Sequence, residues 1–167
     1  MAATPGPAAA DSAVSRDRLE SWGRELRLVH RELRTRIELL RDQVLRGETV
    51  GETDTYLTQE LRLFCLGFCG ALTSHHTAED TRLFPHVVAA HPGLSSVVDR
   101  LMEDHRMLAA LIKDLDRVTR TASAAQVLSH LDGIMAIMES HFGYEERQLT
   151  AVLDALTAPD PAIRSLL

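Results

Sequence analysis

The sequence predicts an all-α protein folded as an antiparallel, up-down-up-down four-helix bundle, and three observations support this. The 167 residues are dominated by helix-forming Leu, Ala, Glu and Arg, while aromatic residues make up only 4% and no alternating β-branched run occurs. Apolar residues recur at steps of three and four along four long stretches. The connections between these stretches are short, as they are between antiparallel neighbours in a bundle. A chain of this length is expected to form one domain with a substantial core.

The first predicted helix begins after Ser15, a good N-cap residue, and runs to about Arg46, where Gly47 should end it. Its apolar positions are Leu19, Trp22, Leu26, Leu33, Ile37, Leu40 and Val44. His30 occupies the step between Leu26 and Leu33. The preceding residues, 1–14, are rich in Pro, Gly and Ala and are predicted to form a flexible tail.

The second predicted helix begins near residue 53 or 54, after a loop that contains two glycines. Pro85 should kink it, and His91-Pro92-Gly93 should end it. Its apolar positions are Leu57, Leu61, Phe64, Phe68, Leu72 and Leu83. His75 and Glu79 continue the same series, so two polar side chains stand where core residues belong.

The third and fourth predicted helices cover about 94–120 and 123–158, and residues 159–167 are predicted to be a tail. The apolar positions of the third helix are Val98, Leu101, Leu108, Ile112 and Leu115, with His105 between the second and third of them. Those of the fourth are Val127, Leu131, Ile134, Met138, Leu149 and Val152. His141 and Glu145 belong to this last stripe, so the bundle spans 15–158 and every helix carries a histidine in its core face.

The polar residues on the core stripes predict a metal site. A buried imidazole or carboxylate costs several kcal/mol unless something compensates it, and a metal ion is a strong compensator. His75 and Glu79 are four residues apart, as are His141 and Glu145, so each pair lies on one helix face. At about 1.5 Å of rise per residue, the histidines of the four helices fall within roughly 9 Å of one another in height. The sequence therefore predicts that they converge.

The convergent set is too large for one tetrahedral zinc site and suits two metal ions bridged by carboxylates. It consists of His30, His75, Glu79, His105, His141 and Glu145. Imidazole and carboxylate together favour iron, manganese or zinc, and a redox role would select iron or manganese. The Glu-x-x-His pairs of ferritin-like proteins and the His-Glu-x-x-His of zinc proteases do not occur at these positions.

The arrangement resembles the hemerythrin-like (HHE cation-binding) domain over about residues 19–156. It has a histidine on the first helix, His-x-x-x-Glu followed by Leu-Phe-Pro on the second, a histidine on the third and His-x-x-x-Glu on the fourth. The resemblance implies that the six residues are ligands of an oxo- or hydroxo-bridged centre of two iron ions. It also implies that Glu79 and Glu145 are the bridging carboxylates.

Two positions depart from the oxygen-carrying members of this family. Those members have a second histidine four residues after the third-helix histidine, where this chain has Ala109. They also have an aspartate five residues after the fourth-helix histidine. Here Glu145 stands at four and Glu146 at five, and Glu145 is chosen as the ligand because it lies on the apolar stripe. One metal therefore loses a ligand, which suggests a more open centre, unless His76 supplies a replacement. The alternative for His76 is a hydrogen bond outside the ligand set.

Residues around the predicted centre have other expected roles. Tyr144 is expected to pack at a helix seam, with donation to a ligand or coordination as the alternative. Asp80 and Glu146 are candidates to orient the ligand histidines by accepting hydrogen bonds. His86, His91 and His130 are expected on the surface.

Composition excludes several classes of function. The net charge of −6 argues against a general nucleic-acid binder, and the arginines of residues 24–46 are interpreted as a solvated helix face. No apolar run is long enough to span a membrane, and the N-terminus lacks the features of a signal peptide. Cys65 and Cys69 are expected as buried, reduced thiols, which favours a cytoplasmic location. No phosphate or organic-substrate pocket is readable.

The functional hypothesis is a di-iron protein that binds O2 or reacts with peroxide, in sensing or detoxification; an enzymatic activity would be catalase-like peroxide decomposition. The alternative is metal storage, or an interaction module whose folding depends on iron, without redox turnover. A bundle with hydrogen-bonded core histidines and no metal is the third reading.

Overall fold

Four long helices and three short helical segments make up the described part of the chain. The computed structural model describes residues 22–49 and 59–155, with residues 48, 49 and 59–62 described by their backbone alone. The elements are α2 (Trp22–Thr49), α3 (Gln59–Ala78), the π turn η1 (Glu79–Leu83), α4 (Phe84–Ala90), the 3-10 turn η2 (Pro92–Leu94), α5 (Ser95–Thr121) and α6 (Ala124–Ala155). These residues include no strand, so the predicted all-α class is confirmed.

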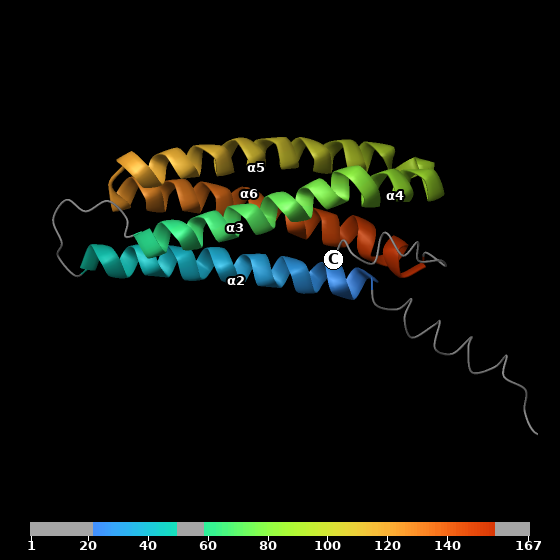
Figure 1. Ribbon diagram of the computed structural model, residues 1–167. Helices are drawn as coiled ribbons and strands as arrows, with labels where there is room; N and C mark the ends of the chain where they lie inside the picture. The colour runs from blue at the N-terminus through green and yellow to red at the C-terminus, as the bar shows by residue number, and fades with distance from the viewer. Residues whose placement is uncertain (1–21, 50–58, 156–167) are drawn as a thin grey trace, which may run out of the picture.

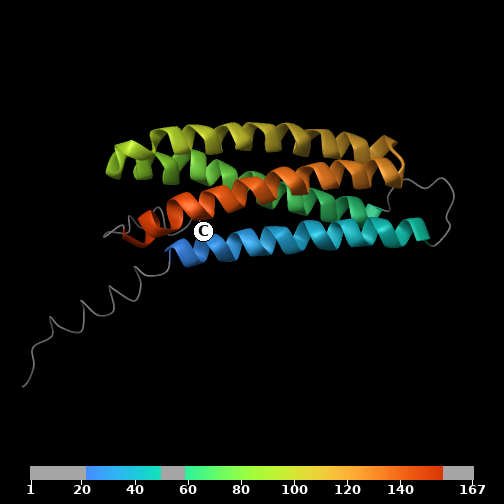
Figure 2. The same ribbon diagram turned by 180° about the vertical axis from the view of Figure 1, so that it is seen from behind.

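The long helices alternate in direction and surround a common core. Figure 1 shows α3 between α2 and α5, and Figure 2 shows α6 between the same two helices on the opposite side. Consecutive helices are antiparallel, because each runs back along the one before it. The up-down-up-down topology predicted from the short connections is therefore confirmed.

The predicted element boundaries agree with the structure except at a few points. The helix predicted to stop at Gly47 continues to Thr49, because a glycine in a last turn can still take helical dihedrals. Pro85 was expected to kink the second helix or end its regular part, and a π turn, Glu79–Leu83, ends two residues before it. The predicted starts of the first and second helices, near residues 15 and 53, and the boundaries of both predicted tails lie outside the described residues.

The apolar stripes form two clusters along the bundle axis, one on each side of the polar residues. One cluster contains Ile37, Phe68 and Leu131, and the other contains Leu26, Phe84 and Leu101. The predicted stripes are buried with two exceptions, Phe64 and Val152, which are half-buried. Next to Val152, Leu153 is fully buried and takes the core position expected for its neighbour. Leu19, Leu57 and the side chain of Leu61 lie outside the described part of the chain.

Helices α2 and α6 approach each other closely at Gly23. A Cβ at this position would lie 2.9 Å from the carbonyl oxygen of Thr150, which is closer than real Cβ contacts allow. The Gly23 backbone N–H donates a hydrogen bond of 2.9 Å to Asp154 Oδ1. The glycine therefore fixes how near the start of α2 lies to the end of α6.

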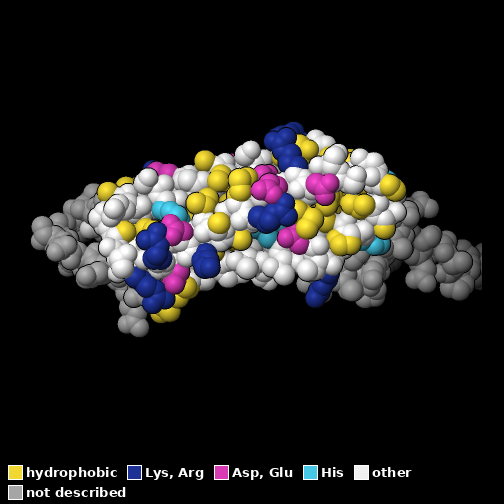
Figure 3. All heavy atoms as spheres, turned by 90° about the horizontal axis from the view of Figure 1, so that it is seen from above, with side chains coloured by type: hydrophobic (Ala, Val, Ile, Leu, Met, Phe, Trp, Pro, Cys, Tyr) yellow, Lys and Arg dark blue, Asp and Glu magenta, His cyan; other side chains and the backbone are white. Residues whose placement is uncertain are grey.

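The outer surface along α5 carries charges of both signs. Seen from above, Lys and Arg side chains adjoin Asp and Glu side chains (Figure 3). Ion pairs along α5 join Arg106 with Glu103 and Arg120 with Asp116. No helix among the described residues combines the length and apolarity that crossing a membrane requires.

Candidate metal centre

Seven buried polar residues meet in the middle of the bundle, between the two apolar clusters. Each of their side chains belongs to a residue no more than 6% exposed. They are His30 from α2, His75 and His76 from α3, Glu79 from η1, His105 from α5, and His141 and Glu145 from α6. These are the seven residues that the sequence nominated as ligands, and the structure brings all of them together.

The seven residues form two overlapping groups of possible ligands. The first half-site consists of His30, His75, Glu79 and Glu145, and the second of His76, Glu79, His105 and His141. Within each half-site, one nitrogen or oxygen atom from every residue lies within 4.8 Å of all the others. Glu79 belongs to both groups, so the arrangement is that of two adjacent cation sites.

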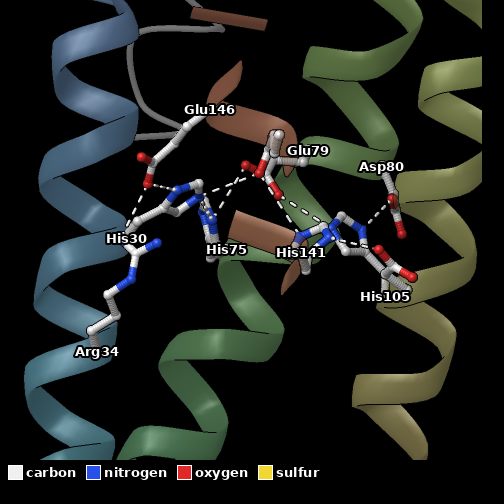
Figure 4. Close-up of polar contacts among 10 residues, drawn as sticks. His30, Arg34, His75, Glu79, Asp80, His105, His141 and Glu146 are labelled. Atoms are coloured by element: carbon white, nitrogen blue, oxygen red, sulfur yellow. Dashed lines mark hydrogen bonds and ion pairs between the residues drawn. The ribbon is translucent and has the colours of Figure 1, made fainter. Parts of the chain in front are cut away.

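The two buried carboxylates each lie between the half-sites. Glu79 Oε1 is 3.2 Å from His75 Nε2, while its Oε2 is 3.5 Å from His105 Nε2. Figure 4 shows Glu79 with His30 and His75 on one side and His105 and His141 on the other. Glu145 Oε2 is 3.3 Å from His30 Nε2 and 3.8 Å from His141 Nε2. Both carboxylates are therefore placed to bridge two cations.

Two partly exposed carboxylates hold the outer nitrogens of two histidines. His30 Nδ1 donates to Glu146 Oε1 at 2.9 Å, and His105 Nδ1 donates to Asp80 Oδ1 at 2.7 Å. These are the two orienting residues expected from the sequence. A proton held on Nδ1 leaves Nε2 as the nitrogen that can present a lone pair to a metal, and in both rings Nε2 faces the interior.

The buried nitrogen and oxygen atoms of the centre are better placed to bind a cation than to hydrogen-bond with one another. His30 Nε2 lies 3.1 Å from His75 Nε2, and His105 Nε2 lies 3.0 Å from His141 Nε2. Both carboxylate oxygens of Glu79 and of Glu145 are buried without a geometrically satisfactory hydrogen bond. Buried acceptors in this number are costly unless positive charge compensates them. Two metal ions would supply that charge and accept the nitrogen lone pairs.

Burial and mutual charge displace the pKa values of these groups. Burial, with the charge of His30, lowers the pKa of His75 to about 3. Burial also lowers the pKa of His141 to about 4. Burial and the charge of Glu145 raise the pKa of Glu79 well above its ordinary value. The rings of His75 and His141 are therefore neutral at pH 7, the state in which an imidazole binds a metal ion.

His30 and Glu145 form the exception in the metal-free protein. Burial lowers the pKa of His30, but the carboxylates of Glu145 and Glu146, 3.3 and 2.9 Å from its ring nitrogens, outweigh burial and leave the value raised. Burial opposes ionisation of Glu145, yet the close contact with His30 lowers the pKa of Glu145 to about 2. Attraction between His30 and Glu145, 3.3 Å apart, therefore offsets part of the charge that a cation would neutralise.

His76 completes the second half-site. Its ring stacks on that of His105 with 4.0 Å between centroids, and its buried Nε2 has no hydrogen-bond partner. Ala109, where the oxygen-carrying proteins have a histidine, is exposed. His76 is therefore placed to supply the ligand that an alanine at position 109 cannot.

The π turn η1 is the local feature that sequence reasoning missed. The backbone N–H of Phe84 donates to the carbonyl of Glu79, five residues earlier, instead of to residue 80. Such a turn adds one residue to the helical repeat, so both Leu83 and Phe84 are buried after Glu79. Pro85, which lacks a backbone N–H, is the one sequence signal for an irregular turn here.

The other candidate residues lie outside the centre. Tyr144 packs on the apolar cluster of Leu26 and Phe84, with the Arg100 guanidinium 4.6 Å from its ring centroid. His91 is exposed as expected, but His86 and His130 are half-buried. His130 Nε2 donates to the backbone carbonyl of Leu111 at 2.8 Å, so its assignment as a surface residue is wrong.

The two cysteines are buried or half-buried and form no disulfide. Burial, with the charge of Asp116, raises the pKa of Cys69 to about 11, so this thiol stays protonated at neutral pH. This agrees with their interpretation as packing residues.

Comparison with known families gives one match. Residues 24–153 match the model of the hemerythrin HHE cation-binding domain. The chain belongs to the hemerythrin HHE cation-binding family. All seven residues of the centre lie inside the matched range, so this hemerythrin-like domain is a metal-cation-binding domain with its candidate ligands in the bundle core. No curated protein and no solved structure matches the chain.

Proposed function

We propose that this hemerythrin-like domain holds two iron ions and uses them to bind O2 or to react with peroxide. The observation that carries the proposal is the sharing of Glu79 between two half-sites whose remaining ligands come from all four long helices. A mixed imidazole and carboxylate set suits iron, and its redox chemistry would use two metals held close together.

Each half-site has four candidate donor residues, but the two differ in the number of imidazoles. Besides the carboxylates, the first half-site has two imidazoles, those of His30 and His75, whereas the second has three. With Glu79 and Glu145 both bridging, the first metal has four protein ligands and the second has five. Iron commonly takes up to six ligands, so the metal of the first half-site keeps more positions open to a small molecule. We therefore assign the binding of O2 or peroxide to the side of His30 and His75.

Aromatic rings separate this centre from water. Phe142 is fully buried and stacks on His30 with 3.9 Å between ring centroids. Phe84, also buried, stacks on His105 at 5.5 Å. Bound ferrous ions would supply electrons to O2 or peroxide. The chain's part is to orient the ligands and to exclude water, which limits uncontrolled side reactions.

The test is reconstitution of the metal-free protein with ferrous iron under anaerobic conditions. We expect two irons per chain, followed by new near-ultraviolet absorption bands when O2 or peroxide is admitted, and oxygen release from peroxide if the activity is catalase-like. Protein loaded with zinc is the matched control, because it fills the same ligands without redox chemistry. Two bound irons with no spectral response to either oxidant would overturn the redox proposal and favour storage or metal-dependent folding.

A further inference from the structure

Four arginines and one glutamate line an open cleft beside the bundle centre. The cleft has a volume of about 410 Å³, within the range of small-ligand sites, and its lining residues are Arg24, Arg27, Arg31, Arg34 and Glu146. Four guanidinium groups against one carboxylate leave three positive charges in excess. This excess is unusual in a chain whose overall charge is −6.

The arginines form one row because of their spacing on α2. They follow one another at steps of three, four and three residues, which places them on a single helix face over roughly 15 Å. Two arginines farther along the same helix are not part of this row and each pair with a carboxylate. Arg36 pairs with Glu32, and Arg41 pairs with Asp132. Arg24, Arg27 and Arg31 are exposed, as the solvated-face interpretation expected, but they lie together along the cleft.

The four arginines of the cleft differ in whether they already bind a carboxylate of the protein. Arg34 binds Glu139 and Glu146, so the carboxylate of Glu146 is neutralised by Arg34 and by His30. Arg27 donates to the hydroxyl of Thr150, a neutral group. Arg24 and Arg31 have no carboxylate partner among the described residues, whereas α5 has several Arg–carboxylate pairs.

We propose that this arginine cleft binds a small organic anion that carries two phosphate groups. Guanidinium groups bind phosphate oxygens through paired, charge-assisted hydrogen bonds. A phosphate monoester carries about −1.5 to −2 charges at neutral pH, so two of them match the excess of the cleft better than one does. Arg24 and Arg31 are about 10 Å apart along the helix axis, which allows each to bind a separate phosphate.

The size and charge of the molecule favour a small ligand over a polymer. A nucleic acid would bring many phosphates against a protein of net charge −6, and the row of arginines is only about three turns long. The proposed site does not depend on the metal centre. Arg34 connects the two regions through Glu146, so it is left unchanged in the test.

Titration calorimetry with hexane-1,6-diol bisphosphate tests this proposal in the full-length, metal-loaded protein at physiological salt. We expect saturable binding of one molecule per chain. Hexyl monophosphate is the matched probe with a single phosphate and should bind at least tenfold more weakly. The double variant Arg24→Gln/Arg31→Gln should lose at least tenfold in affinity for the bisphosphate, with unchanged metal content.

The control is Arg117→Gln/Arg120→Gln on α5, which changes the net charge by the same amount. Both of its arginines are exposed and paired with aspartates, so it should bind the bisphosphate as the unaltered protein does. Equal loss of affinity in the two double variants would overturn the proposal, because it would show attraction by overall charge alone. Absence of saturable binding would also overturn it, including when the protein binds anionic lipid vesicles instead.

Discussion

The two half-sites share Glu79 but differ in the number of helices that supply their imidazoles. The imidazoles of the first half-site, His30 and His75, come from α2 and α3. Those of the second, His76, His105 and His141, come from α3, α5 and α6. A cation in the second half-site would thus connect three helices through nitrogen ligands, whereas one in the first would connect two.

The histidines of the two half-sites are also supported differently. His105 is held by Asp80, which follows Glu79 directly in the π turn, so one local segment supplies both a bridging ligand and an orienting group. His30 is held by Glu146, whose own position depends on Arg34 of α2. This difference supports our proposal that the small molecule binds at the first half-site.

The largest loss of bound metal is expected from substitution of Glu79, the residue that belongs to both half-sites. Glu79→Ala removes the one carboxylate assigned to both groups, so metal content should fall from two equivalents to well below one. Metal analysis after gel filtration measures this, with His91→Ala as a control on an exposed histidine. Retention of two metals by Glu79→Ala would contradict the shared-ligand assignment.

A single half-site can be removed through His76. Because this ring belongs to the second group alone, His76→Ala should leave about one metal equivalent per chain. His30→Ala should likewise leave about one, but in the second half-site. Loading each variant with cobalt and comparing the visible spectra would separate the two environments. Two tightly bound metals in His76→Ala would show that this residue is an outer hydrogen-bonding group.

Weaker effects are expected from the orienting carboxylates. Asp80→Ala and Glu146→Ala should each reduce the affinity of one metal by roughly 10- to 100-fold, as loss of such partners does elsewhere. Asp80→Ala should act on the second half-site and Glu146→Ala on the first. Competition with a chelator measures both affinities. If either variant lost affinity equally for both metals, the assignment of each carboxylate to one half-site would be contradicted.

The smallest predicted effect is a loss of folding stability in the metal-free protein as the pH falls. The lowered pKa values of His75, His76 and His141 mean that the unfolded chain takes up these protons first as pH falls below about 6.5. The raised pKa values of Glu79 and His30 oppose this, because there the folded state holds the proton. The unfolded state gains more protons on balance, so stability should decrease on the order of 1 kcal/mol from pH 6.5 to 5.5.

Urea denaturation of the chelator-treated protein at the two pH values measures this change. His91→Ala should show the same dependence, since its ring is exposed. Stability that stays constant or increases in acid would contradict the predicted burial of neutral imidazoles.

Helical periodicity and connection lengths were sufficient to predict the bundle and to nominate six of the seven residues of its centre, with His76 left open. Helical periodicity specifies which residues share a face, so His30, His105 and His141 could be assigned to the core without coordinates. Short connections specified antiparallel neighbours, and counting along each helix gave a common height. These properties depend on spacing within one helix, and spacing is what a sequence records.

The tertiary structure alone decided how these side chains meet. The inward position of His76 and the π turn after it depend on how α3 and the following segment pack on α5. The placement of Glu79 between two half-sites and the cleft beside Arg24 and Arg31 depend on the relative rotation and approach of different helices. Periodicity within a helix does not specify those quantities, because they result from the packing of all the side chains between the helices.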